Sequence, residues 1–332
     1  MIPEAKKRGL GQYFTKERTW LKDNVRDFIL NTGRIVAYDP FAGSGDLLSV
    51  LRELGFSITK GLDIDGDLGW DLNDSLEGIP NIENAIVVTN PPYLSNYSAK
   101  RRHLYDKVKK YFEATHYDDL YLIALHQMLR SQDYVVAIVP ETFVNSPFPK
   151  ERACSINVLE DNPFAETETP VCVVCFDGTS KSLYDVRVYK NNHFKYTLGE
   201  LGDKRLIPNY DMNIRFNSTM GKIGLRAADT TDPNRRISFM GREELDYDIE
   251  NIKVSSRMVT LIEADLPEDL LPVFIGTCNK ILENYRADTD DLLLSPFKGN
   301  MKNGVRRRRL DFGTCRAIME IALKETVKGK SI

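Results

Sequence analysis

Residues 34–46 read RIVAYDPFAGSGD, and this stretch decides the class of fold. Its first half, residues 34–38, is a short and mainly apolar run, which is typical of a strand buried on both faces. The run ends in Asp39-Pro40, and a glycine-rich turn then leads into residues 45–54, which have helical spacing. A strand, a tight turn and a helix are the repeating unit of doubly wound α/β sheets, which bind ligands at the carboxyl ends of their strands.

Further apolar runs follow at residues 56–62, 85–89 and 134–139, and residues 117–130 have helical spacing. We therefore expect an α/β fold with a doubly wound, mostly parallel sheet. In the second half, residues 171–176 and 183–189 are strand-like, 199–240 are polar without a clear period, and 266–285 and 313–324 are plausible helices. We place a domain boundary near Ser180, which gives domains 1–180 and 181–332.

The composition is that of an ordinary globular protein, with 42% hydrophobic and 28% charged residues in a chain of 332. No apolar run is long enough to cross a membrane, and residues 1–11 lack the apolar core of a signal peptide. The five cysteines are sparse and odd in number, which fits a reducing compartment. We expect a cytoplasmic monomer with no membrane contact.

Charge is unevenly distributed, although the net charge is only −3. Residues 295–332 hold ten Lys and Arg against three acidic residues, which is 10 − 3 = +7, whereas residues 242–291 are acidic. The basic segment predicts either a local anionic partner or an ordinary solvated surface. We favour contact with DNA phosphates for its densest part, which consists of Lys298, Lys302, Arg306, Arg307, Arg308 and Arg309.

The glycine-rich turn after the first strand lets a ligand approach the backbone and the start of the following helix. It is not the dinucleotide-binding pattern GxGxxG, because residue 48 is leucine, and no GK[ST] follows as in a P-loop. Asp39 in front of the turn disfavours a phosphate and suits a ligand that carries an ammonium or sulfonium group. A purely structural tight turn is the alternative.

The second strand ends in Gly61-Leu62-Asp63-Ile64-Asp65. A carboxylate at this place accepts hydrogen bonds from ribose hydroxyls in many nucleoside-binding sheets, so we assign that role to Asp63. A solvated acidic turn would explain the same residues.

The sharpest signal is Thr89-Asn90-Pro91-Pro92-Tyr93, which follows the apolar run 85–89. Two successive prolines fix a rigid exit, which holds an amide, a backbone carbonyl and an aromatic ring side by side. The Asn90 amide and the carbonyl of Asn90 or Pro91 can accept from one –NH₂ group, and the Tyr93 ring can stack on the ring system that bears it. This arrangement suits an aromatic exocyclic amine that acts as a nucleophile.

With these motifs, the chain resembles the γ-type DNA N6-adenine methyltransferases, a group of class I S-adenosylmethionine-dependent amino-methyltransferases. Gly11-Gln12-Tyr13-Phe14-Thr15, the Asp39 loop and the NPPY motif come in the order of that group, and a C-terminal target-recognition region should follow. The resemblance covers residues 9–176. It implies a seven-stranded sheet, S-adenosylmethionine as the cofactor and double-stranded DNA as the partner. A cognate restriction endonuclease that acts separately is compatible with this resemblance, but the sequence leaves its existence open.

The resemblance also implies roles for individual residues. Those that bind the cofactor would be Tyr13, Phe14 and Thr15 at its methionine end, Asp39 at its ammonium, Phe41, Ala42 and Gly43 in the loop, Asp63 with Ile64 at the ribose, and Asp71 with Leu72 at the adenine, where Asp67 and Asp74 are close competitors. Asn90 would line the same cofactor site. The target base would be held by Asn90, Pro91, Pro92 and Tyr93, with Phe164 on its other face. Lys16 departs from the group, which usually has proline there.

The implied reaction is methyl transfer to the N6 amine of an adenine that has been flipped out of the DNA stack. Stacking on an aromatic side chain is worth about 1–3 kcal/mol per base, which suits the pair Tyr93 and Phe164. Three alternatives remain: an RNA-adenine methyltransferase, a protein-glutamine methyltransferase, and a non-catalytic DNA-binding subunit. No metal is expected, because Cys172 and Cys175 lie three apart in an apolar strand and nothing completes a set of four ligands.

Overall fold

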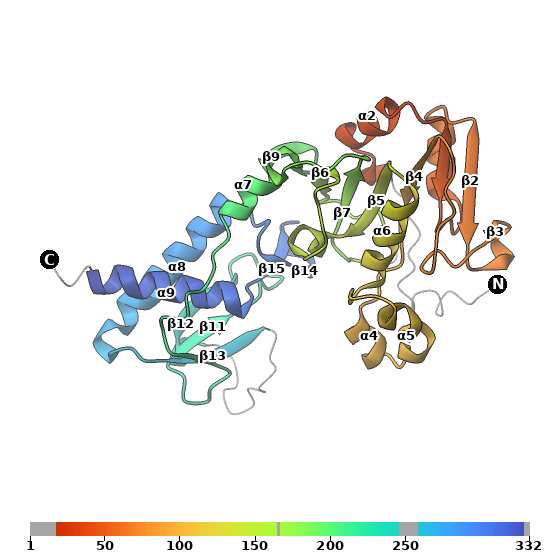
Figure 1. Ribbon diagram of the computed structural model, residues 1–332. Coiled ribbons are helices and arrows are strands. Elements are labelled where there is room, and N and C mark those ends of the chain that lie inside the picture. The colour runs from red at the N-terminus through yellow and green to blue at the C-terminus, as the bar shows by residue number, and fades with distance from the viewer. Residues whose placement is uncertain (1–17, 165–166, 246–257, 329–332) are drawn as a thin grey trace. The chain divides into compact units, whose positions relative to one another are not determined.

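The computed structural model describes residues 18–164, 167–245 and 258–328. The chain forms two compact units, Met1–Glu200 and Leu201–Ile332, and each is described here by itself (Figure 1). Within the described residues, no helix is both long enough and apolar enough to cross a membrane.

The first unit is built on a nine-stranded sheet in the order β3-β2-β1-β4-β5-β7-β6-β8-β9. Strands β1 to β5 and the β6–β8 pair run parallel, whereas β7 is antiparallel to both of its neighbours and β9 is antiparallel to β8. The strands are β1 (Val36–Asp39), β2 (Ile58–Asp63), β3 (Asp71–Leu72), β4 (Ala85–Thr89), β5 (Val135–Pro140), β6 (Ala153–Val158), β7 (Val171–Phe176), β8 (Arg187–Lys190) and β9 (His193–Thr197).

The expectation of seven strands is corrected to nine. Strand β8 pairs with the edge of β6, and β9 pairs with β8, so both extend the first sheet. The two compact units divide after Glu200, so β8 and β9 fall in the first of them. The second half of the chain thus contributes two strands to the first unit.

Helices cover both faces of this sheet, as a doubly wound fold requires. Alternate strand residues, among them Ala37, Ile86 and Val136, pack in one apolar core with side chains of α2 and α3. The intervening residues point to the opposite face, where α6 crosses in front of the sheet (Figure 1). The helices are α2 (Asp23–Asn31), α3 (Asp46–Glu53), α4 (Asn96–Arg101), α5 (Tyr105–Glu113), α6 (Leu120–Ser131) and α7 (Leu198–Asp203), with 3₁₀ turns at Arg18–Trp20, Gly66–Leu68, Glu141–Asn145 and Leu183–Asp185.

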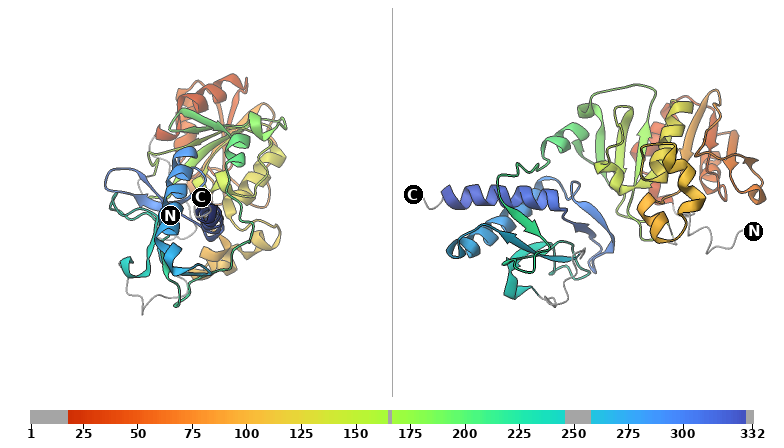
Figure 2. Two further views of the ribbon diagram at one scale, coloured as in Figure 1. Left: turned by 90° about the vertical axis from the view of Figure 1, so that its left-hand side faces the viewer. Right: turned by 60° about the horizontal axis from the view of Figure 1, so that its bottom comes forward.

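The second unit contains a four-stranded antiparallel sheet in the order β10-β13-β11-β12 and a separate hairpin, β14-β15. Helix α8 packs on β12 and against α9 (Figure 2). The elements are β10 (Ile214–Phe216), β11 (Ile223–Arg226), β12 (Ser238–Gly241), β13 (Val259–Ala264), α8 (Leu271–Asp288), β14 (Ser295–Asn300), β15 (Arg306–Arg309) and α9 (Phe312–Lys328), with 3₁₀ turns at Arg242–Glu244 and Glu268–Leu270.

Candidate active site

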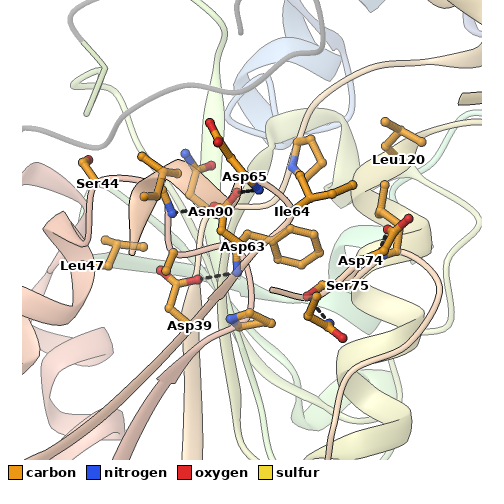
Figure 3. Close-up of a pocket in the computed structure, with 18 of the residues that line it drawn as sticks. Asp39, Ser44, Leu47, Asp63, Ile64, Asp65, Asp74, Ser75, Asn90 and Leu120 are labelled. Atoms are coloured by element: carbon orange, nitrogen blue, oxygen red, sulfur yellow. Dashed lines mark hydrogen bonds between the residues drawn. The ribbon is translucent and has the colours of Figure 1, made fainter. Parts of the chain in front are cut away.

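A pocket of about 250 Å³ lies where strands β1, β2 and β4 end (Figure 3). Because these strands are parallel neighbours, their carboxyl ends meet at one edge of the sheet. Asp39, Asp63 and Asn90, which were assigned from three separate motifs, all line this pocket. The full lining consists of residues 39–44, 46–47, 63–65 and 73–76 with Leu68, Asn90, Pro92, Lys107, Val108, Tyr111 and Leu120.

Asp39 is the buried carboxylate of the pocket, with 1% of its surface exposed. Its Oδ1 accepts hydrogen bonds from the Phe41 amide at 2.9 Å and from the Thr89 hydroxyl at 2.5 Å. Burial raises the pKa of Asp39 to about 7, because these two hydrogen bonds only partly offset the loss of water. Since both bonds end on Oδ1, Oδ2 can accept from a cationic ligand.

Asp63 holds the glycine-rich turn against the end of β2. Its Oδ2 accepts from the Gly43 amide at 2.9 Å, and its Oδ1 accepts from the Asp65 amide at 2.9 Å. A carboxylate has about four lone-pair directions, so two remain for a ligand hydroxyl. Asp63 is therefore both a support of the turn and a candidate acceptor for a ribose.

Trp70 is a structural support of the pocket that the sequence did not reveal. Its indole Nε1 donates to the Gly43 carbonyl at 2.9 Å, and its ring lies against Gly45 and Gly61. Gly45 has φ +83°, and a Cβ there would come within 2.8 Å of the Trp70 ring. Position 45 therefore requires glycine for two reasons: its backbone is left-handed, and the Trp70 ring leaves no room for a side chain.

We predict that Gly61→Ala destabilises the first unit by about 1–3 kcal/mol, because the new methyl group would overlap the Trp70 ring. Denaturant unfolding measures the loss, and a displaced Trp70 should also weaken ligand binding. Gly78→Ala is the matched control, since nothing lies within 4 Å of a Cβ at that position. Equal stability of the two variants would show that Trp70 does not hold the turn.

The side of the pocket opposite Ser44 and Leu47 is formed by the segment after β3 (Figure 3). Asp74 lies in that wall, and it accepts from Lys110 Nζ at 2.9 Å and from the Tyr111 hydroxyl at 2.8 Å. Asp71 and Leu72, which were assigned to the cofactor adenine, are exposed on β3 and do not line the pocket. Asn73 and Asp74 take their place in the lining.

Asn90 and Pro92 bring the NPPY motif into the pocket, and Pro91 is buried beside them. The Tyr93 hydroxyl lies 2.5 Å from Asn90 Oδ1 and 2.7 Å from the Ile138 carbonyl oxygen. The ring of Tyr93 is turned inward, so it does not line the pocket. The hydroxyl therefore competes for one lone pair of the side-chain acceptor that a target amine would use.

Phe164 is buried in the apolar core, and its ring centroid lies 6.1 Å from that of Tyr93 at an interplanar angle of 68°. The two predicted base-stacking residues are thus neighbours, but they meet edge to face. No parallel slot separates them in this conformation, so a base could enter only after one ring turns. Tyr121 packs against Tyr93 in a similar way, with centroids 6.4 Å apart at 84°.

The proposed methionine-end residues Tyr13, Phe14 and Thr15 lie outside the described residues. Ile64, Phe41, Ala42 and Gly43 line the pocket. Helix α5 also contributes to the pocket, with Lys107, Val108 and Tyr111, which no motif in the sequence marks. A weak signal for it existed, because Val108, Tyr111 and Phe112 have the spacing of one apolar helix face.

In the second unit, the four consecutive arginines of β15 do not form one exposed cluster. Strand alternation buries Arg306 and Arg308, which are 8% and 1% exposed. Arg307 lies over the Phe297 ring at 4.6 Å and donates from Nε to the Asp229 carbonyl at 2.9 Å. Among the residues assigned to phosphates, Lys298 and Lys302 are exposed, whereas Arg307 and Arg309 are half-buried.

A buried ion pair next to β15 fixes the backbone of this strand. Arg286 makes a bidentate contact with Asp229, with both N–O distances at 2.9 Å, and also pairs with Asp291 at 2.8 Å. The amide of Arg308 donates to Asp229 Oδ2 at 2.9 Å. Burial alone would raise the pKa of Asp229, but the hydrogen bonds and charge of Arg286, with the backbone amides of Ile237 and Arg308, lower it. The hairpin is thereby fixed to the core of the second unit.

Comparisons with known proteins identify only a distant likeness of fold. No family model and no curated protein matches the chain. Among solved structures, the EcoKI type I restriction enzyme M protein aligns with 12% identity and a TM-score of 0.37, covering 96% of this chain and 71% of that one. The type I restriction-modification methyltransferase subunit from Streptococcus thermophilus aligns with 15% identity and a TM-score of 0.37, covering 54% of this chain and 47% of that one. TrmN from Thermus thermophilus aligns with 15% identity and a TM-score of 0.29, covering 46% of this chain and 48% of that one.

The chain thus spans about half the length of two of these three proteins, at 47% and 48%. The distant similarity is to class I S-adenosylmethionine-dependent methyltransferases, several of them modification subunits. At these identities and TM-scores it assigns neither a substrate nor site residues to this chain.

Proposed function

We propose that the chain transfers a methyl group from S-adenosylmethionine to the N6 amine of adenine in double-stranded DNA, as the modification protein of a restriction-modification system. The observation that carries the proposal is the shared pocket of Asp39, Asp63 and Asn90. The hydrogen bond from Thr89 to Asp39 joins the two motifs directly, because Thr89 precedes Asn90. A cation-binding carboxylate thus lies beside an amide that can accept from an amine.

The pocket fits S-adenosylmethionine by the chemistry of its side chains. Asp39 would hold the ammonium group, and the free lone pairs of Asp63 would accept from the ribose hydroxyls. Ile64, Leu76 and Val108 offer an apolar lining for the adenine, with polar atoms of Asn73 and Asp74 at its edge. When bound, the cofactor supplies an electrophilic methyl group on sulfonium.

The target amine would be oriented by Asn90. Its Oδ1 and a backbone carbonyl of the motif would accept the two amine hydrogens, which leaves the nitrogen lone pair free to point away from them. The amine needs no strong base before it attacks, since its proton can leave afterwards. The contribution of the protein is therefore mainly alignment and electrostatic stabilisation.

Base binding requires a movement of Tyr93 in this proposal. Its hydroxyl must leave Asn90 Oδ1, and its ring must turn away from the edge-to-face contact with Phe164. Flipping the adenine costs a few kcal/mol of unstacking, and one aromatic stack returns about 1–3 kcal/mol. The turned Tyr93 ring supplies that stack.

We expect the purified chain to bind S-adenosylmethionine by calorimetry and to label double-stranded DNA with its methyl group. Long-read modification mapping of host DNA after expression should show N6-methyladenine within one sequence motif. Labelling of duplex RNA or of a glutamine peptide, with DNA unlabelled, would contradict the substrate. Failure to bind the cofactor would instead indicate a non-catalytic DNA-binding subunit.

A further inference from the structure

Helices α4 and α5 form a small layer directly after the NPPY motif, and they project beyond the sheet (Figure 1). The layer is anchored at its base, where the Asn96 amide donates to the Asp118 carbonyl at 2.8 Å and the Leu120 amide donates to the Leu94 carbonyl at 3.1 Å. Its two ends are thus tied together, so its position relative to Asn90 is fixed by the backbone.

The inner side of this layer is apolar, and its outer side is basic. Ala99, Val108, Tyr111 and Phe112 are buried. Residues 96–113 contain six Lys and Arg against Asp106 and Glu113, which is 6 − 2 = +4 in a chain of net charge −3. The exposed basic side chains are Lys100, Arg101, Arg102, Lys107, Lys109 and Lys110.

Two of these six cations have a partner among the described residues. Lys110 pairs with Asp74 and Glu77, and Lys100 lies over the Tyr105 ring at 4.8 Å. The described part of the chain offers no ion pair to Arg101, Arg102, Lys107 or Lys109. Some exposed cations elsewhere in the first unit do have acidic partners, such as Arg18 with Glu53. On this layer, four of the six exposed cations lie within residues 101–109 and have no ion pair with a described residue.

The layer also borders the pocket, because Lys107 and Tyr111 of α5 line it. We propose that the outer face of α4 and α5 binds the phosphate backbone of DNA next to the target base. This inference rests on the proposed function and names the part of the first unit that holds the substrate. Exposed arginine and lysine side chains are the usual partners of phosphate oxygens, and such contacts position the duplex without reading its sequence.

The test replaces Arg101 and Arg102 together by glutamine, which keeps helix propensity and removes two charges. Lys107 stays unchanged because it lines the pocket. The matched control is the double variant Arg26→Gln with Lys60→Gln, which removes two exposed charges from α2 and β2. Fluorescence anisotropy with a labelled mixed-sequence DNA duplex gives the binding constant of the full chain over a series of salt concentrations.

We expect the slope of log K against log salt to become shallower by about 1.8 in the Arg101/Arg102 variant, at about 0.9 per lost phosphate contact. The control should keep the slope of the unmodified protein, and both variants should bind S-adenosylmethionine normally. An unchanged slope in the Arg101/Arg102 variant would overturn the assignment of this face while leaving the proposed reaction intact. If the unmodified protein binds the cofactor but no DNA duplex, or only duplex RNA, the proposed substrate fails and the surface fails with it.

Discussion

Replacing Asn90 by alanine is expected to abolish most methyl transfer to DNA while S-adenosylmethionine still binds. Asn90 Oδ1 is the side-chain acceptor that faces both the pocket and Tyr93. Without it, the target amine loses the group that aims its lone pair, and loss of one such stabilising contact costs about 10²–10³ in rate. Single-turnover methylation of DNA measures the rate, and calorimetry measures cofactor binding.

Two further variants separate chemistry from folding. Asn96→Ala is the control, because its side chain contacts Asp118 and does not line the pocket, so turnover should stay near normal. Asn90→Asp keeps acceptor oxygens at the site and should retain more activity than Asn90→Ala. Near-normal turnover in Asn90→Ala would exclude Asn90 from the reaction.

The second large effect concerns Asp39→Asn, which should weaken S-adenosylmethionine binding by about 2–5 kcal/mol, the cost of breaking a buried charge pair. Asparagine retains an Oδ1 that accepts from Phe41 and Thr89, so the turn should keep its shape. What is lost is the negative charge opposite the ammonium. Calorimetric dissociation constants of the variant and the unmodified protein test this, and equal values would exclude Asp39 from the cofactor site.

The pH dependence of cofactor binding gives an independent check on Asp39. Because burial raises its pKa to about 7, the free protein carries a protonated Asp39 below that pH. An ammonium ligand binds the ionised form, so affinity should rise with pH up to about 7 and then level off. Asparagine cannot titrate, so the variant should lack this rise.

The stability of the cofactor-free protein should change in the opposite direction. A carboxyl whose folded pKa lies above its unfolded value contributes a stability that falls as pH rises between the two values. At pH 8 the unmodified protein therefore bears the full cost of a buried charge, and Asp39→Asn should unfold at a higher temperature. Asp39 thus favours binding at the expense of stability.

The strands that carry the site could be predicted from sequence, because short apolar runs ending in Asp39, Asp63 and Asn90 leave little choice of structure. The residues at the adenine end of the pocket could not be predicted in this way. Strand β3 has only two residues, so no periodicity distinguishes Asp71, which is exposed, from Asp74, which faces the pocket. Before Asp74, the chain passes through the 3₁₀ turn Gly66–Leu68, and Trp70 holds this segment against Gly43. No sequence pattern predicts either feature.

The run of four arginines, residues 306–309, shows a second limit of prediction from sequence. Four identical residues have no periodicity, so the alternation that buries Arg306 and Arg308 is invisible in the sequence. The strand is positioned in part by Asp229, which lies far away along the chain and accepts from the backbone of Arg308. The density of charge in the sequence therefore predicted one exposed cluster, whereas two of the four arginine side chains are buried. The first-unit cations of α4 and α5 are less dense in sequence but more exposed.

The position of Trp70 gives the protein a spectroscopic property of its own. Only two tryptophans occur in the chain, and Trp20 is buried in the core at 1% exposure. Trp70 bonds to the Gly43 carbonyl and lies against two glycines of the pocket frame. Any ligand that shifts the glycine-rich turn must change the surroundings of the Trp70 indole. Intrinsic emission is thus a label-free signal from the pocket.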